Sequence, residues 1–205
     1  IISKIKGYDG KFKAGTYSLS SSMTTTDIAK LLISGKVENI TFTIPEGYTI
    51  FQIADKLADE GLVNKKTMYN LLKTGDYNYD FLSDAQTGEN HLEGYLFPNT
   101  YQIEINASED TIIKTMLNQF QIIFTDKYKT RAKTLGYSIN DIITIASIIE
   151  RECSVDSERS KVASVIYNRL KKPMPLQMCS TVQYVLGKQK ESLTTADTKI
   201  DSPYN

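Results

Sequence analysis

The 205-residue sequence is poor in histidine and cysteine and contains no tryptophan. One histidine and two cysteines cannot complete a tetrahedral zinc site unless carboxylates supply the other ligands. A Ser-His-Asp or Cys-His mechanism would have to use His91, because no other imidazole is present in the sequence. Two cysteines are also too few for a disulfide scaffold. Cys153 and Cys179 could form a disulfide with each other or stay as thiols, and a small buried thiol is the simplest interpretation of each.

The sequence also lacks net charge and long apolar runs. Its 24 basic residues balance 24 acidic ones, which argues against a nucleic-acid partner held by bulk electrostatics. No apolar run reaches the roughly 18 residues that suggest a transmembrane helix. Charge is nevertheless segregated, since residues 38–110 carry thirteen acids and four lysines while residues 127–172 carry ten bases and five acids. Either charge is simply distributed unevenly over the solvated surface, or an acidic and a basic module face different partners.

The first 75 residues contain a weak internal repeat. Residues 16–19 (TYSL) match residues 41–44 (TFTI), and each tetrad alternates polar and apolar side chains as a half-buried strand does. Apolar residues at helical spacing follow each tetrad, and Gly35 and Gly61 stand where helix C-terminal glycines are expected. The pattern predicts two strand–helix units that pack together in a small module over residues 1–75.

The rest of the chain is predicted to be mainly helical. A stretch rich in Gly, Asp, Asn and Ser at 74–91 is the predicted linker, so the second domain covers residues 76–205. Apolar spacing predicts helices at 108–125, 126–135, 138–152 and 156–172, and a short one from Thr181 through Val185. A small strand–helix module before a mainly helical domain gives an α+β fold class.

Capping residues mark two of the predicted helix starts. Thr49 is a predicted N-cap with Gln52 at the capping-box distance. Ser138 or Asn140 caps the helix of residues 138–152, where Asp141 in the first turn interacts favourably with the helix dipole.

The helix at 138–152 is apolar on almost every side, which predicts burial of most of its surface. Its apolar stripe continues onto Glu150, which has two interpretations. In the first, Glu150 is structural and pairs with a basic residue, for which Arg151, Arg159 and Arg169 are candidates. In the second, Glu150 lies in a partly dry cleft. Loss of hydration in such a cleft favours the protonated carboxyl that a general acid needs. Glu152 is about 200° further round an ideal helix and does not share this face.

Several motifs, in order along the chain, resemble those of the YceG-like endolytic murein transglycosylases, the MltG family. The matching segments are 43–47 (TIPEG), 92–101 (LEGYLFPNTY), 146–152 (ASIIERE), 162–170 (VASVIYNRL), 176–177 (LQ) with 181–182 (TV), and 201–205 (DSPYN). The resemblance covers about residues 15–205. It departs from the family at Cys179-Ser180, where members commonly have Asp-Pro.

The resemblance implies that Glu150 is the catalytic acid and base of a lyase that uses no cofactor and no metal. Glu150 would protonate the glycosidic oxygen between N-acetylmuramic acid and N-acetylglucosamine, and would then deprotonate the muramoyl 6-hydroxyl that closes a 1,6-anhydro ring. The substrate-binding candidates are Glu93, Tyr95, Tyr101, Glu152, Asn168, Arg169, Gln177 and Thr181. Each of these could instead be structural, Tyr101 as a core residue and Asn168 and Arg169 by tying down the loop that follows them.

The resemblance also implies where the parent protein works. Family members have a single membrane anchor, then a LysM-like module and the catalytic domain, so an anchor is expected before residue 1 and further catalytic elements after residue 205. The expected location is the extracytoplasmic face of the bacterial membrane. The expected partners are the glycan strands of peptidoglycan and the cell-wall synthases, with no nucleic acid.

Two other functions stay open from the residues themselves. A non-catalytic glycan-binding or scaffold protein would use Glu150 for structure alone. A lysozyme-like hydrolase would need a second carboxylate close to Glu150 and would release reducing ends.

Overall fold

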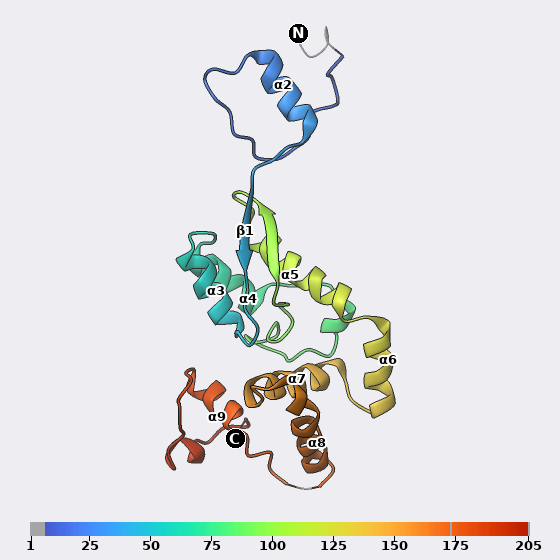
Figure 1. The fold of residues 1–205 in the computed structure, drawn as a ribbon, viewed down its shortest axis with the longest axis vertical. Coiled ribbons are helices and arrows are strands. Elements are labelled where there is room, and N and C mark those ends of the chain that lie inside the picture. The colour runs from blue at the N-terminus through green and yellow to red at the C-terminus, as the bar shows by residue number, and fades with distance from the viewer. Residues whose placement is uncertain (1–6, 173, 205) are drawn as a thin grey trace. The chain divides into compact units, whose positions relative to one another are not determined.

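The computed structural model describes residues 7–172 and 174–204 (Figure 1). Helices dominate this part of the chain, and two strands form one antiparallel sheet. This combination confirms the predicted α+β fold class. Across the described residues, no helix combines the length and the apolar character needed to span a membrane.

The chain divides into two compact units. The first contains the residues up to Gly75 together with Leu96–Phe120, and the second contains Asp76–Tyr95 together with the residues from Gln121 onward. The chain therefore leaves the first unit within the 74–91 stretch, but it returns to that unit for residues 96–120. Whether the units correspond to a LysM-like module and a catalytic domain stays a prediction.

The first unit combines the sheet with several helices. Its elements are α2 (Thr25–Ser34), β1 (Asn39–Thr43), α3 (Ile50–Asp59), α4 (Lys65–Thr74), β2 (Thr100–Glu104) and α5 (Glu109–Ile123) as far as Phe120. The helix α4 and the strand β2 have no counterpart among the elements predicted from the sequence. α3 packs against α4 (Figure 1). Between them, Tyr69 donates a hydrogen bond to Asp55 at 2.7 Å.

The sheet shows where the prediction of an internal repeat fails. β1 overlaps the strand predicted at 41–44, but it pairs with β2, and Phe42 lies opposite Tyr101 with 5.3 Å between the ring centroids. Residues 16–19 form no helix or strand, so the strand predicted there is wrong. Leu19 is 54% exposed, and the tetrad therefore has no buried face that would stabilise a strand.

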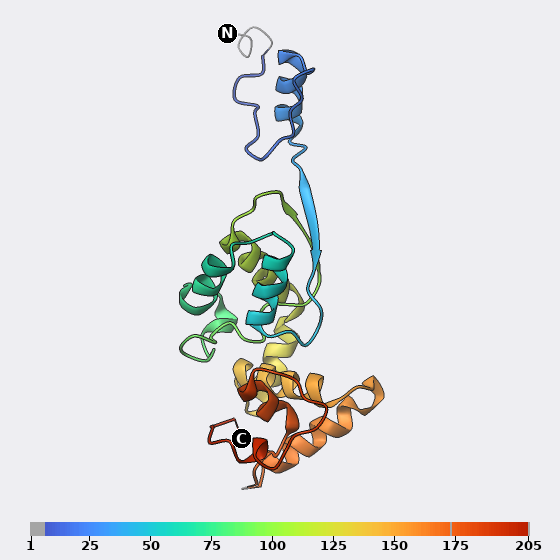
Figure 2. The same ribbon diagram turned by 90° about the vertical axis from the view of Figure 1, so that its left-hand side faces the viewer.

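The second unit is helical. Its elements are η1 (Asp80–Leu82), the end of α5, α6 (Asp126–Leu135), α7 (Ile139–Glu152), η2 (Asp156–Glu158), α8 (Arg159–Leu170), α9 (Cys179–Leu186) and η3 (Asp197–Lys199). The α-helices lie within a few residues of the predicted ones. α8 and α9 both pack against α7 (Figures 1 and 2). Ile145 and Ile148 of α7 form a small core with Ile166 of α8.

The predicted capping residues are confirmed at both helix starts. Thr49 and Gln52 form a reciprocal capping box at the start of α3, and Ser138 and Asp141 form another at the start of α7. Gly35 ends α2 in the left-handed conformation, with φ at 67°. These hydrogen bonds satisfy backbone groups that the helix ends would otherwise leave without partners.

The buried face of α7 differs from the prediction. Ile145 and Ile148 are buried, whereas Ala146 is exposed and Ile142 and Ile143 are only half-buried. The expected burial of most of the helix surface is therefore wrong. A sequence that is apolar on almost every side does not indicate which side the neighbouring helices will cover.

Gly94 allows the segment before residue 96 to approach α7 closely. A Cβ atom on Gly94 would lie 2.5 Å from Cγ2 of Ile143, and the glycine φ of 84° is one that other residues rarely adopt. Beside it, Tyr95 is buried and donates a hydrogen bond to Asn140 of α7 at 3.3 Å. The glycine therefore lets Tyr95 pack beneath α7.

Gly94→Ala is expected to lower the free energy of unfolding by about 2–4 kcal/mol, about 1 kcal/mol from the strain of a positive φ and the rest from overlap of the new methyl group with Ile143. Gly136→Ala is the matched control, since Gly136 has a similar positive φ and a methyl group added there would meet no atom within 4 Å. It should cost only the backbone strain, about 1 kcal/mol. Urea unfolding of both variants measures the difference, and equal costs would show that the Gly94 contact is unimportant.

Candidate active site

Glu150 lies in the last turn of α7 with its side chain 29% exposed. Its Oε2 accepts a hydrogen bond from Nη1 of Arg159 at 2.5 Å, and Arg159 also donates from Nε to Asp156 at 2.9 Å. The hydrogen bond to Glu150 is the main cause of the raised pKa of Arg159. The guanidinium of Arg159 thus links the end of α7 to η2 and the start of α8. Of the three arginines that the sequence offered as partners for Glu150, Arg159 is the one that the structure pairs with it.

Glu152, two residues further on, is directed elsewhere. Its Oε1 accepts a hydrogen bond from the backbone N–H of Ser180 at 2.7 Å, in the first turn of α9. A carboxylate at this place interacts favourably with the helix dipole and satisfies one of the free N–H groups of the helix end. Glu152 therefore anchors α9 to α7, and the structural alternative is favoured for this candidate.

Side chains of the flanking helices hold the loop between α8 and α9 by hydrogen bonds to its backbone carbonyls. Nη1 of Arg169 donates a hydrogen bond to the carbonyl of Leu176, which agrees with the interpretation that Arg169 ties down the following loop. Thr181 donates from its hydroxyl to the carbonyl of Met178 at 2.9 Å. Gln177 is exposed and has a φ of 49°, a left-handed conformation that is uncommon outside glycine. Of these three candidates, Gln177 alone leaves its side chain exposed.

Glu93 belongs to a cluster of aromatic and polar side chains. Its Oε2 accepts a hydrogen bond from the hydroxyl of Tyr184 at 3.3 Å, and Asn90 donates to the same hydroxyl at 3.3 Å. Burial, followed by the charge of Glu93, raises the pKa of Tyr184. The ring of Tyr204 lies 5.4 Å from that of Tyr184. Tyr184 is not among the residues predicted from the sequence, because nothing in a single short helix indicates a distant carboxylate.

The two tyrosine candidates are inside the protein. Tyr95 is 1% exposed, and burial is the main cause that raises its pKa to about 12. Tyr101 is buried in the first unit, donates its hydroxyl to the carbonyl of Phe97 and also has a raised pKa because of burial. Both positions favour a packing role for these side chains, and the core alternative for Tyr101 agrees with its place opposite Phe42.

Asn168 faces away from the core residue Ile166. It is exposed and lines a groove between α6 and α8 with Tyr167 and Lys171. Its Nδ2 atom lies 3.5 Å from the hydroxyl oxygen of Ser164 on the same helix. Unlike Arg169, Asn168 therefore keeps a polar group available for a ligand.

The two cysteines are free thiols. Cys153 is buried, as predicted, and its sulfur donates to the carbonyl of Val155 at 3.0 Å. Cys179 is exposed, so the expectation of a buried thiol is wrong there, because the residue lies at the start of α9 on its outer side. In the part of the chain that the structure describes, no three His, Cys, Asp or Glu side chains form a group that could hold a metal ion.

Comparison with known proteins assigns the chain to a family. The model of the YceG-like family matches residues 1–205. The chain belongs to the YceG-like family. It is 39% identical to an endolytic murein transglycosylase of Bacillus subtilis over 98% of this chain, and 34% identical to one of Streptococcus pneumoniae over 98% of this chain.

Solved structures agree with this YceG-like assignment. The crystal structure of a YceG-like protein from Listeria monocytogenes is similar with a TM-score of 0.71 and 34% identity, and the match covers 100% of this chain and 71% of that one. The chain spans 59% of the B. subtilis relative and 41% of the S. pneumoniae relative.

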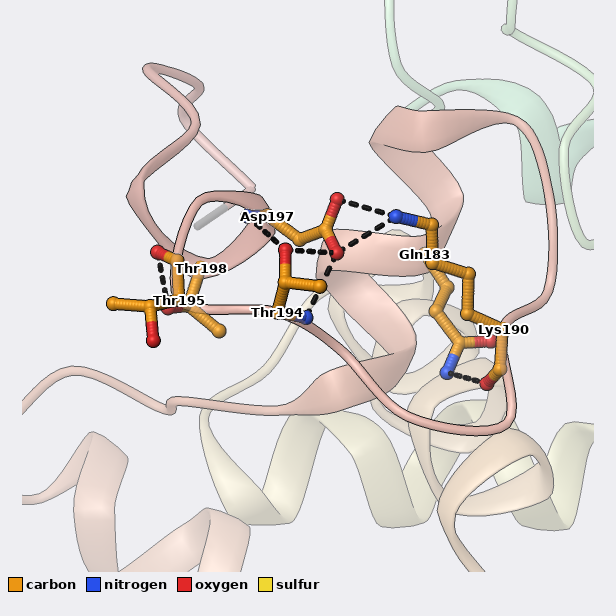
Figure 3. Close-up of polar contacts among 6 residues, drawn as sticks. All are labelled: Gln183, Lys190, Thr194, Thr195, Asp197 and Thr198. Carbon is orange, nitrogen blue, oxygen red and sulfur yellow. Dashed lines mark hydrogen bonds and ion pairs between the residues drawn. The ribbon is translucent and has the colours of Figure 1, made fainter.

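In this YceG-like chain, an ion pair closes the segment that follows α9 (Figure 3). Lys190 donates to both carboxylate oxygens of Asp197, at 2.6 and 2.7 Å, and the backbone and hydroxyl of Thr194 donate at 2.8 and 2.7 Å. Gln183 of α9 donates to the Lys190 carbonyl at 3.4 Å. These hydrogen bonds, first that of Lys190, hold the pKa of Asp197 well below its usual range. Thr194 and Asp197 have the three-residue spacing of a capping box, and this spacing is the sequence signal that could have predicted their hydrogen bonds.

Asp197→Asn is expected to lower the free energy of unfolding at neutral pH. The difference from wild type should become smaller in acid. The pKa of Asp197 is lower in the folded chain than in the unfolded one, so its ionised form stabilises the fold above the unfolded pKa. That stabilisation is lost progressively as the pH falls below about 4. Urea unfolding of wild type and variant at several pH values measures the margin.

Asp126→Asn is the matched control, because Asp126 is 95% exposed and contacts only Lys129, at 3.3 Å, among the ion pairs of the described residues. It should have little effect at any pH. A margin for Asp197→Asn that does not change between neutral and acid pH would contradict the account of this ion pair.

Proposed function

We propose that this chain is an endolytic peptidoglycan lytic transglycosylase with Glu150 as its general acid and base. The proposed reaction cleaves the bond between N-acetylmuramic acid and N-acetylglucosamine in nascent glycan strands and leaves 1,6-anhydro-muramoyl ends. The names of the B. subtilis and S. pneumoniae relatives support the reaction class. The observation that carries the residue assignment is the partly exposed carboxyl group of Glu150, which pairs with Arg159 near the end of α7, whereas Glu152 is bonded to the backbone of Ser180.

The proposed chemistry needs one carboxyl group that works twice. Glu150 first gives its proton to the glycosidic oxygen, and the bond from that oxygen to the muramoyl C1 breaks. The resulting carboxylate then takes the proton of the muramoyl 6-hydroxyl, whose oxygen forms the new bond to C1. The proton of Glu150 is restored, and no water is consumed.

Arg159 has a double effect in this scheme. In the second step Glu150 acts as a carboxylate base, and its Oε2 already accepts a charge-assisted hydrogen bond from Arg159 at 2.5 Å. The first step needs the protonated form, in which we infer that Oε1 carries the proton while Oε2 keeps the hydrogen bond from Arg159. Asp156 can then keep the guanidinium in place, since it is bonded to Nε and not to the Nη1 that holds Glu150.

A two-carboxylate hydrolase is less well supported. Such an enzyme needs a second carboxylate that activates water or attacks the sugar. Glu152 already accepts a hydrogen bond from Ser180, and Asp156 is 92% exposed and bonded to Arg159. Neither carboxylate lies free beside Glu150.

A non-catalytic glycan-binding protein is the second candidate. One specific observation favours it, because a structural Glu150 is expected to pair with a neighbouring arginine, and Glu150 does pair with Arg159. The same ion pair therefore fits both functions, and product analysis has to separate them.

Further proposals concern the whole protein. We propose that residues 1–75 include a LysM-like module and that residues 76–205 belong to the catalytic domain. We also propose that the protein acts at the extracytoplasmic face of the bacterial membrane, held there by an N-terminal anchor, beside cell-wall synthases. Peptidoglycan strands are assembled at that face, and an enzyme for nascent strands has to meet them there.

Glu150→Gln is expected to lower the yield of anhydro-muramoyl ends at least about a hundredfold, because an amide cannot transfer the proton. Mass spectrometry of digested glycan strands measures these ends. Glu158→Gln is the matched control, since Glu158 lies in η2 with its side chain 55% exposed. It should leave the yield near that of wild type.

Three results would contradict parts of this proposal. Equal yields of anhydro ends from wild type and Glu150→Gln would remove Glu150 from the chemistry. Glycan binding without any new ends would support the non-catalytic function. Reducing ends in place of anhydro ends would support a hydrolase.

A further inference from the structure

The groove between α6 and α8 has no part in the chemistry proposed for Glu150. It has a volume of about 490 Å³, and its lining residues belong to the second unit. Those that define its chemistry are Arg131, Thr134, Tyr137, Tyr167, Asn168 and Lys171. Arg131 and Thr134 are three apart on α6, while Tyr167 and Asn168 lie near the end of α8, whose C-cap is Lys171, so each helix turns one face to the groove.

The charge of the groove is positive. Arg131 and Lys171 both line it, and among its described lining residues none is acidic. The surrounding helix strengthens this field, because α6 carries four basic residues and a single acid, Asp126. Two of the ten bases of residues 127–172 thus line this one groove.

Two tyrosines supply an aromatic wall. The rings of Tyr137 and Tyr167 are 5.4 Å apart at an angle of 60°, and both are partly buried against the Ile145–Ile166 core. Burial raises the pKa of Tyr167, and the charge of Arg131 opposes that shift, so the Arg131 cation acts on this ring. A flat apolar surface beside a cation, with the amide of Asn168 next to it, suits a sugar ring that carries an anionic group.

The groove and Glu150 are at opposite ends of α7. The helix has 14 residues, a length of about 20 Å at 1.5 Å per residue. Glu150 is in its last turn, whereas Tyr137 precedes its first residue. Since α8 runs back from Arg159 beside Glu150 to Tyr167 beside Tyr137, both sites stand on the same pair of packed helices.

We propose that the α6–α8 groove is a second binding site for the glycan strand, which takes a muramoyl unit with its acidic peptide stem. The sugar ring lies against Tyr167, and the stem carboxylates meet Arg131 and Lys171. This inference rests on the glycan substrate proposed above. It adds a site about one helix length away from the reacting bond, which would let the protein hold a strand at an internal position.

The test is a titration of this chain carrying Glu150→Gln, which prevents turnover, followed by calorimetry and NMR. The probes are a muramoyl tetrasaccharide with peptide stems, the same glycan without stems, and a neutral N-acetylglucosamine tetramer. Arg131→Gln with Lys171→Gln should raise the Kd for the stem-bearing glycan about tenfold, from two lost charge contacts. The Kd values for the two probes without stems should stay nearly unchanged.

Lys133→Gln with Lys161→Gln is the matched control, because it removes the same amount of charge from α6 and α8 at positions outside the groove. It should change the Kd less than about twofold. An equal loss in both double variants would mean general electrostatic attraction and overturn the proposal, as would no loss in either. An equal loss for the stemless glycan would overturn the role of the stem.

The readout is separate from catalysis. If wild type makes no anhydro ends but the groove variants still lose affinity selectively, the proposed reaction fails and the binding site stands. If Glu150→Gln abolishes the ends and the groove variants bind normally, the groove proposal fails alone.

Discussion

The contact between Arg159 and Glu150 fixes the geometry on which the proposed function depends. Glu150 is in the last turn of α7, where a helix end leaves a side chain free to turn. The 2.5 Å ion pair sets its direction, and the second bond of Arg159, to Asp156, fixes the guanidinium itself. A planar guanidinium can hold two carboxylates at once, which an ammonium group does less well.

The helices around this ion pair form one scaffold. Glu152 fastens α9 to the end of α7, and Arg169 fastens the loop that leads to α9. Beyond α9, Asp197 and Lys190 close the next segment. Each of these charged side chains makes a hydrogen bond that stabilises the local backbone conformation. Glu150 is the carboxylate of α7 that we assign to the proposed chemistry. At the other end of the same helix pair, the basic groove offers room for a further part of the strand.

Local signals in the sequence were sufficient for some features. The capping boxes at Thr49 and Ser138 depend on residues three apart, so spacing alone revealed them. The strand β2 and the burial of Tyr95 depend on contacts between residues far apart in the chain, which no local pattern encodes. The same holds for Glu152, whose role follows from α9 being packed on α7. Glu150 was singled out by its place in the motif, and its choice of Arg159 among several arginines required the folded chain.

Steady-state kinetics of Arg159→Gln and Arg159→Lys on glycan strands tests most directly whether this ion pair positions the catalytic group. If the ion pair positions Glu150, Arg159→Gln lowers kcat by a factor of up to about a hundred with little change in KM, because the carboxyl is misdirected while substrate binding is kept. Arg159→Lys should recover part of kcat, since it restores the charge without the two-sided contact. A folded Arg159→Gln variant with the kcat of wild type would contradict the account.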